Sequence, residues 1–129
     1  MKRLFSMLLL AAAICLFAAC TPQSSPRQLA KTFWTDVQQE KYSEAVSLYY
    51  NIDEFISEDG KEALVALMKV DAALYGKITK VKVLSVDKSD EPDRAVVTVE
   101  LTTENRPQPR VETMDVVKSN GKWYIDFNI

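Results

Sequence analysis

The chain has 129 residues, with 16 basic and 18 acidic side chains, no histidine and a formal net charge of −2. This length suits one domain with a single hydrophobic core. Because the charge is balanced, no basic surface is expected, and nucleic acid is excluded as a partner. The three glycines stand apart and both cysteines lie near the N-terminus, which excludes a glycine-rich phosphate loop and a zinc cluster. We therefore expect neither a cofactor nor a metal ion.

The first 19 residues are predicted to be a signal peptide. Lys2 and Arg3 precede an apolar run from Leu4 to Ala19. That run has about 16 residues, whereas a membrane-spanning helix needs roughly 20. A basic start, an apolar middle and small residues at the end are typical of an exported protein. Residues 1–19 are therefore expected to be removed.

The end of this segment carries a lipidation signal. Phe17-Ala18-Ala19-Cys20 resembles the lipobox of bacterial lipoproteins. The resemblance implies that Cys20 carries diacylglycerol on its thiol and an acyl chain on its new amino group, with residues 20–25 as a short tether. Two or three acyl chains anchor a protein firmly to a membrane. The alternative is an ordinary Cys20 that follows a conventional Ala-x-Ala cleavage site.

The lipobox also bears on location and chemistry. It places the chain in the bacterial cell envelope, and the absence of an aspartate after Cys20 favours the outer membrane. With lipid on its thiol, the mature chain has no free thiol and no imidazole. Ser-His-Asp and Cys-His mechanisms and histidine-ligated metals cannot be built from such a chain. No catalytic residue is therefore expected.

Helical patterns occupy the first half of the remaining sequence. Ser25 and Pro26 begin a helix predicted over 26–40, because serine caps a helix and proline fits its first turn. A second, short helix is predicted from Ser43. A third begins near 57–59 and ends at Gly76, since glycine favours the backbone conformation that ends helices. The apolar residues that recur at helical spacing are Leu29, Phe33 and Val37, then Ala45, Leu48 and Tyr49, then Ala63, Leu64, Leu67, Met68, Leu74 and Tyr75.

In the second half of the chain the apolar period changes to two, which predicts four strands. The parity of the apolar positions shifts near Val83, and a β-bulge would explain that shift. Residues 95–101 alternate without interruption, and a further run covers about 110–118. Asn120-Gly121 is a strong hairpin signal before the last run. That run, 123–129, places Trp123, Ile125, Phe127 and Ile129 on one face.

Helices followed by an antiparallel meander predict an α+β fold. We expect a single domain over residues 26–129, in which three N-terminal helices pack on a bent four-stranded antiparallel sheet. A sheet that bends around a long helix forms a cone with an opening at one end. Such an opening is the natural place for a pocket.

Two segments resemble a known superfamily: Lys41-Tyr42-Ser43-Glu44-Ala45 and Asn120-Gly121-Lys122-Trp123-Tyr124-Ile125-Asp126. They are similar to segments of the nuclear transport factor 2-like (cystatin-like cone) superfamily, and the similarity covers about 26–129. Within it, the chain most resembles a family of small bacterial lipoproteins with a domain of unknown function. The resemblance implies the cone fold and homodimers that pair through the sheet face. The superfamily includes enzymes, ligand carriers and dimerisation modules, so no activity and no catalytic residue is implied.

The main candidate site is a pocket inside the cone. Aromatic side chains with a few polar groups are the usual lining of a small-ligand site. Here they would take a small apolar ligand; the alternative is that they only fill the core. The aromatic candidates are Trp34, Tyr49, Tyr50, Tyr75 and Trp123.

Asp71 joins this candidate pocket because it interrupts the apolar stripe of the third helix. Buried in the cone, it would act as a general base, since burial raises the pKa of a carboxyl group. The alternative places it at the edge, exposed or paired with a lysine, because Val70 and Ala73 can complete the stripe.

Other polar features have plainer interpretations. Asp53-Glu54 and the stretch 87–93 are typical of solvated turns, and the second lacks the glycine and the spacing of an EF-hand loop. The outward sheet face is either plain surface or a pairing face for a second copy or for another partner. Its residues are Val96, Thr98, Glu100, Thr102, Val111, Thr113, Asp115 and Val117.

These observations predict a lipid-anchored, non-enzymatic binding or assembly module of the cell envelope. The alternative is a small-molecule carrier that uses the aromatic-lined cavity. An enzyme built on Asp71 is the least favoured of the three.

Overall fold

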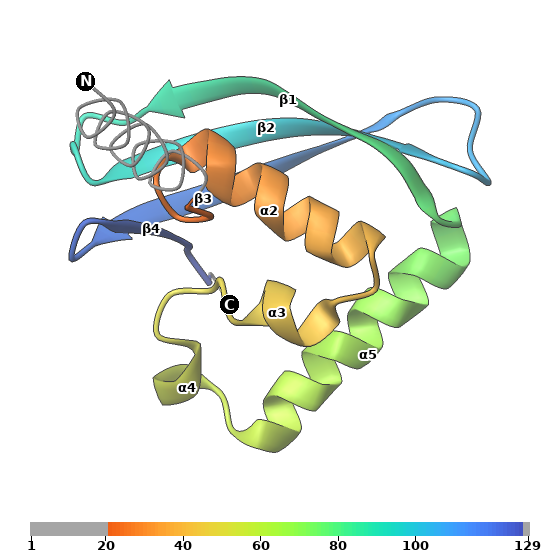
Figure 1. Cartoon of the computed structure of the whole chain (residues 1–129), viewed down its shortest axis with the longest axis horizontal. Coiled ribbons are helices and arrows are strands. Elements are labelled where there is room, and N and C mark those ends of the chain that lie inside the picture. The colour runs from red at the N-terminus through yellow and green to blue at the C-terminus, as the bar shows by residue number, and fades with distance from the viewer. Residues whose placement is uncertain (1–20, 128–129) are drawn as a thin grey trace, which may run out of the picture.

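The computed structural model describes residues 21–127. The predicted signal peptide, Cys20 and Ile129 therefore lie outside the described residues. Within residues 21–127, four helices precede four strands (Figure 1). The helices are α2 (Pro26–Gln38), α3 (Tyr42–Val46), α4 (Ile52–Phe55) and α5 (Glu58–Tyr75), and the strands are β1 (Ile78–Lys88), β2 (Arg94–Thr103), β3 (Arg110–Ser119) and β4 (Lys122–Ile125).

The strands form an antiparallel meander in the order β1-β2-β3-β4. The register between β1 and β2 shifts between Val83 and Ser85, which confirms the bulge expected from the change in parity. Asn120 and Gly121 both have positive φ, as a two-residue hairpin turn requires, and Ser119 pairs with Lys122 across it. The α+β fold predicted from the sequence is thus confirmed.

Side-chain caps fix the starts of the two long helices. The Ser25 hydroxyl accepts a hydrogen bond from the Gln28 backbone N–H at 3.1 Å, and Pro26 occupies the first turn of α2. The Ser57 hydroxyl does the same for the Gly60 N–H at 3.2 Å, which starts α5. Both satisfy backbone donors that the first turn of a helix leaves without partners.

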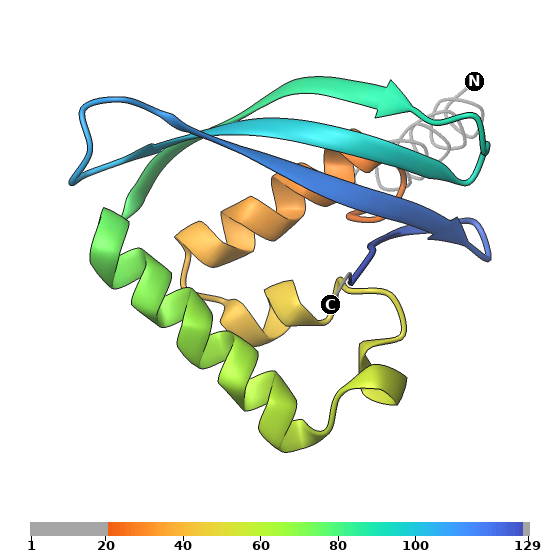
Figure 2. The ribbon, with the colours of Figure 1, turned by 180° about the vertical axis from the view of Figure 1, so that it is seen from behind.

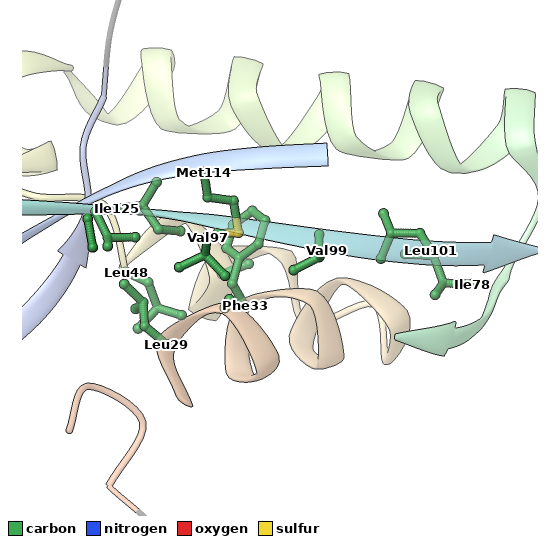
Figure 3. Close-up of a cluster of buried hydrophobic side chains, with 13 residues drawn as sticks. Leu29, Phe33, Leu48, Ile78, Val97, Val99, Leu101, Met114 and Ile125 are labelled. Atoms are coloured by element: carbon green, nitrogen blue, oxygen red, sulfur yellow. The ribbon is translucent and has the colours of Figure 1, made fainter. Parts of the chain in front are cut away.

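The core lies between α2 and the concave face of the sheet (Figure 3). The alternating residues of β2 all point into it, as the period of two predicted. Leu29, Ala30 and Phe33 of α2 cover them, and the short helix α3 adds Ala45. The fully buried side chains of greatest volume are Leu29, Leu101, Val97, Val99 and Val116.

The long helix α5 differs from expectation, because none of its residues is buried. It packs mainly beside α3, below the sheet rather than against it (Figures 1 and 2). Leu67 and Leu74, expected on its packed stripe, are each 64% exposed. The side that turns inward carries smaller or more polar residues as well, among them Lys61, Asp71 and Ala72.

Two further differences concern short segments. The sequence predicted no element at Ile52–Phe55, where one helical turn forms. The last strand ends at Ile125 rather than running on, because Ile125 also pairs with the segment after α3: its N–H donates to the Leu48 carbonyl and its carbonyl accepts from the Tyr50 N–H. The chain is thereby drawn from the sheet toward the helices.

The described chain begins packed against the sheet. The backbone N–H of Trp123, in β4, donates to the Gln23 carbonyl at 3.0 Å. This bond ties the segment before α2 to the β3–β4 hairpin. Within residues 21–127, no helix combines the length and the apolar character needed to cross a membrane.

Gly76 combines a positive φ with a close neighbour. It ends α5 with φ 81° and ψ −179°, a combination that side chains strongly disfavour. A Cβ at this position would also meet Asn105 Cγ at 2.8 Å. Gly121 shares the positive φ but has open space around its Cα.

We therefore expect Gly76→Ala to lower the free energy of unfolding by about 1–3 kcal/mol from backbone conformation alone, with the clash in addition. Gly121→Ala is the matched control and should cost about 1 kcal/mol. Urea unfolding of the two variants measures the difference. Equal losses of unfolding free energy in the two variants would contradict the clash between a side chain at position 76 and Asn105.

Candidate binding cleft

An open cleft of about 460 Å³ lies between α5 on one side and β3 on the other. The end of α2 and the segment after β4 close its inner wall. The residues that line it are Phe33, Trp34, Val37, Tyr49, Leu64, Leu67, Met68, Asp71, Glu112, Thr113, Met114, Asp115, Ile125, Asp126 and Phe127. Most are apolar, and the polar ones are mainly carboxylates.

A chain of aromatic rings forms one wall of the cleft. Phe33 packs edge to face on Trp34 and on Tyr49, with ring centroids 5.0 and 5.8 Å apart, and Tyr49 packs in the same way on Phe127 at 5.5 Å. The Trp34 indole N–H donates to the sulfur of Met114 at 3.2 Å. Burial raises the pKa of the Tyr49 phenol, which keeps it neutral. This wall is rigid, apolar and uncharged.

At the opposite end of the cleft, Arg110 forms two ion pairs. Its guanidinium donates to Asp71 at 2.8 Å and to Glu112 at 2.9 Å, and it lies over the Tyr75 ring at 4.3 Å. Burial acts to lower the pKa of Arg110, but the hydrogen bonds to Asp71 and Glu112 outweigh that effect and raise the pKa. The guanidinium thus links α5 to β3, although these elements make few other contacts.

Asp71 lies at the edge of the cleft, as the more conservative interpretation expected. Its side chain is 44% exposed. Its partner is Arg110 and not a lysine, so that detail of the prediction is wrong. A half-exposed carboxylate held by a guanidinium has a structural explanation that needs no catalytic role.

The predicted pocket residues do not all meet at one site. Trp34, Tyr49 and Asp71 line the cleft together. Tyr75 lies with Asp71 in a second, larger hollow of about 820 Å³ on the other side of Arg110. Tyr50 packs on Tyr124, with ring centroids 5.7 Å apart, and Trp123 packs on the edge of the core. Tyr50 and Trp123 line neither the cleft nor the second hollow.

Sequence patterns alone did not reveal several lining residues. Glu112 and Met114 share the parity of the buried Val116, so extending the strand alternation would have turned both toward the concave side. Arg110 shares it as well, but its long-range partner on α5 leaves no local signal. Phe127 meets Tyr49 beyond the end of β4, a contact that the alternation over 123–129 does not indicate.

The remaining predicted features stay at the surface. Asp53 and Glu54 are exposed, and the turn after β1 is exposed throughout. Among residues 21–127, no three histidine, cysteine, aspartate or glutamate side chains come close enough to hold a metal ion. The pairing of a second copy with the outward sheet face is not tested by a single chain and stays a prediction.

Solved structures of other proteins share the fold, and three of them are compared with this chain. A candidate NTF2-like transpeptidase from Campylobacter jejuni has a TM-score of 0.63 and 20% identity, over 81% of this chain and 100% of that one. A SEC-C motif-containing protein from Rhodopseudomonas palustris has a TM-score of 0.58 and 14% identity, over 81% and 77%. A candidate calcium/calmodulin-dependent protein kinase type II association domain from Thiobacillus denitrificans has a TM-score of 0.56 and 14% identity, over 80% and 90%.

At these identities the likeness shows the fold alone, and that fold is NTF2-like, as the two sequence segments implied. No curated protein matches the sequence. A family model does match, over residues 56–128, which include all of α5 and the whole sheet. Its description is the C-terminal domain of the low molecular weight antigen MTB12. The chain belongs to this MTB12 C-terminal domain family.

Proposed function

We propose that the chain is a lipid-anchored, non-enzymatic binding module of the bacterial cell envelope, and that the cleft between α5 and β3 takes a small apolar ligand. The observation that carries the proposal is the open cleft walled by Phe33, Trp34, Tyr49 and Phe127. Its volume of about 460 Å³ lies within the range of about 300–1,000 Å³ that small-molecule sites occupy.

The chemistry of the lining favours binding over catalysis. Among the carboxylates that line the cleft, Asp71 and Glu112 are held by Arg110 and Asp126 is held by Arg94. The mature sequence contains no histidine and no cysteine other than Cys20. The activity named for the Campylobacter protein is not carried over, because 20% identity supports fold alone.

The exposed residues of α5 allow a matched test of the cleft. Leu67 and Leu74 are both leucines of the same helix, and both are 64% exposed. Only Leu67 lines the cleft. Because neither side chain is buried, replacing either one should leave the fold intact.

We expect the neutral fluorophore N-phenyl-1-naphthylamine to bind the wild-type chain and Leu74→Asp with equal affinity. Leu67→Asp should bind it at least about tenfold more weakly, since removing a leucine contact costs about 1.5 kcal/mol or more. Fluorescence titration measures the three dissociation constants. No binding to the wild-type chain, or equal binding by both variants, would overturn the assignment of the cleft.

The membrane anchor is a separate part of the proposal and rests on the sequence. The lipobox-like segment ends at Cys20, one residue before the described chain begins. The described residues contain no membrane-crossing helix, so the proposed attachment is through lipid. We place the lipid in the outer membrane, because no aspartate follows Cys20.

Labelling with an alkyne fatty acid in cells tests the anchor. The wild-type chain should take up label and partition with membranes, whereas Cys20→Ser should lose both properties. Cys15→Ser is the control and should label normally, because that cysteine lies within the segment expected to be removed. Label that persists in Cys20→Ser would refute the lipobox interpretation.

A further inference from the structure

One stretch of β3 has a neighbouring strand on one side only. From Arg110 to Val117, β3 pairs with β2. On the other side β4 pairs only with Val116–Ser119, and the Asp126 N–H extends that pairing to the Asp115 carbonyl at 2.8 Å. Within residues 21–127, no strand pairs with Arg110–Met114 on this side. Figure 2 shows this part of β3 at the rim of the sheet.

The pairing pattern identifies which backbone groups face this open edge. In an antiparallel sheet, alternate residues point their N–H and C=O groups to the same side. The Asp115 carbonyl faces β4, and the Lys118 N–H faces the other way, to the Asp93 carbonyl beside β2. Val111 and Thr113 share the direction of Asp115. Their backbone groups therefore face outward, ready to pair with another strand.

The side chains along the edge are arranged for self-pairing. Val111 is 57% exposed on the outward face, whereas its neighbours Arg110 and Glu112 turn to the concave face. The order is thus positive, apolar, negative. Two such strands placed antiparallel about Val111 bring each Arg110 opposite the Glu112 of the other copy. Arg110 already donates to Asp71 and Glu112 of its own chain, so the gain in this register is that opposite charges rather than like charges face each other.

We propose that a second copy of this chain pairs with the open edge of β3, antiparallel and in the register that places Val111 opposite Val111. Each Val111 then exchanges both of its backbone hydrogen bonds with its counterpart. The Thr113 N–H of each copy can donate to the Pro109 carbonyl of the other. This edge-to-edge pairing differs from the face-to-face dimer that the superfamily resemblance implies.

Neighbouring registers are less favourable than the Val111 register because each brings a conflict of charge or of hydrogen bonding. A shift that places Glu112 opposite Glu112 sets two like charges against each other. A shift toward the C-terminal end centres the pair on Thr113 and runs it into Asp115, whose carbonyl already pairs with Asp126. A shift the other way sets Arg110 opposite Arg110, which again places two like charges against each other. The Val111 register alone avoids all three conflicts.

Disulfide trapping tests the register directly. In the proposed pair the two Val111 Cα atoms lie about 5.5 Å apart, within the range of about 4.4–6.8 Å that disulfides span. The two Thr113 Cα atoms lie more than about 13 Å apart, because four residues of strand separate them along the pair. Thr113 is exposed on the same strand and the same face, so it is a matched control.

The trapping experiment uses the full chain with Cys15→Ser and Cys20→Ser, so that the introduced cysteine is the only thiol. We expect Val111→Cys to form a covalent dimer under mild oxidation and Thr113→Cys to stay monomeric. A dimer from Thr113→Cys with none from Val111→Cys, or a dimer from neither, would overturn the proposal.

A substitution that removes only the outward donor provides a second measurement. Val111→Pro deletes the N–H that faces the edge and leaves the ladder to β2 intact. Val111→Thr keeps that N–H and a β-branched side chain. In sedimentation experiments, the wild-type chain and Val111→Thr should show a dimer that Val111→Pro lacks. A monomeric wild-type chain, or a dimer unchanged in Val111→Pro, would contradict the assignment.

Discussion

The packing of α2 on the concave face of the sheet is the contact on which the rest of the structure depends. Leu29, Ala30 and Phe33 of α2 cover the inward residues of β2, and together these residues make up more than half of the buried cluster. Burial of such residues is the dominant favourable term in folding. Once α2 fills the concave face, α5 has no sheet left to cover. The long helix therefore stays outside the core and leaves the cleft open.

The stability of the fold and the shape of the cleft therefore rest on different contacts. The buried cluster contains no residue of α5, and only Met68 of that helix packs against it. The link from α5 to β3 is the ion pair between Asp71 and Arg110. An ion pair that is partly exposed contributes little to stability. Its value here is geometric, because a guanidinium that contacts Asp71, Glu112 and the Tyr75 ring holds two elements at a defined separation. The width of the cleft is set by that contact.

The elements defined by local chemistry could be predicted from the sequence. The serine at position 25, the Asn120-Gly121 turn and the alternation along β2 each specify a conformation over a few residues. The position of α5 could not be predicted, because its sequence offers apolar residues on more than one flank and does not say which one packs. Likewise, Arg110 and Asp71 are far apart in the chain, so no local pattern connects them. The cleft depends on these long-range contacts, so the sequence predicts only part of its lining.

The hydrogen bond between Gln23 and Trp123 has a consequence for how the module would sit on a membrane. With the proposed lipid at Cys20, three residues at most separate the bilayer from a point fixed on the β3–β4 hairpin. Such a segment spans no more than about 10 Å even when fully extended. The segment between the lipid and the domain would then be too short to let the domain move freely relative to the membrane. The domain would stand close to the lipid headgroups in a narrow range of orientations, with the hairpin end turned toward them.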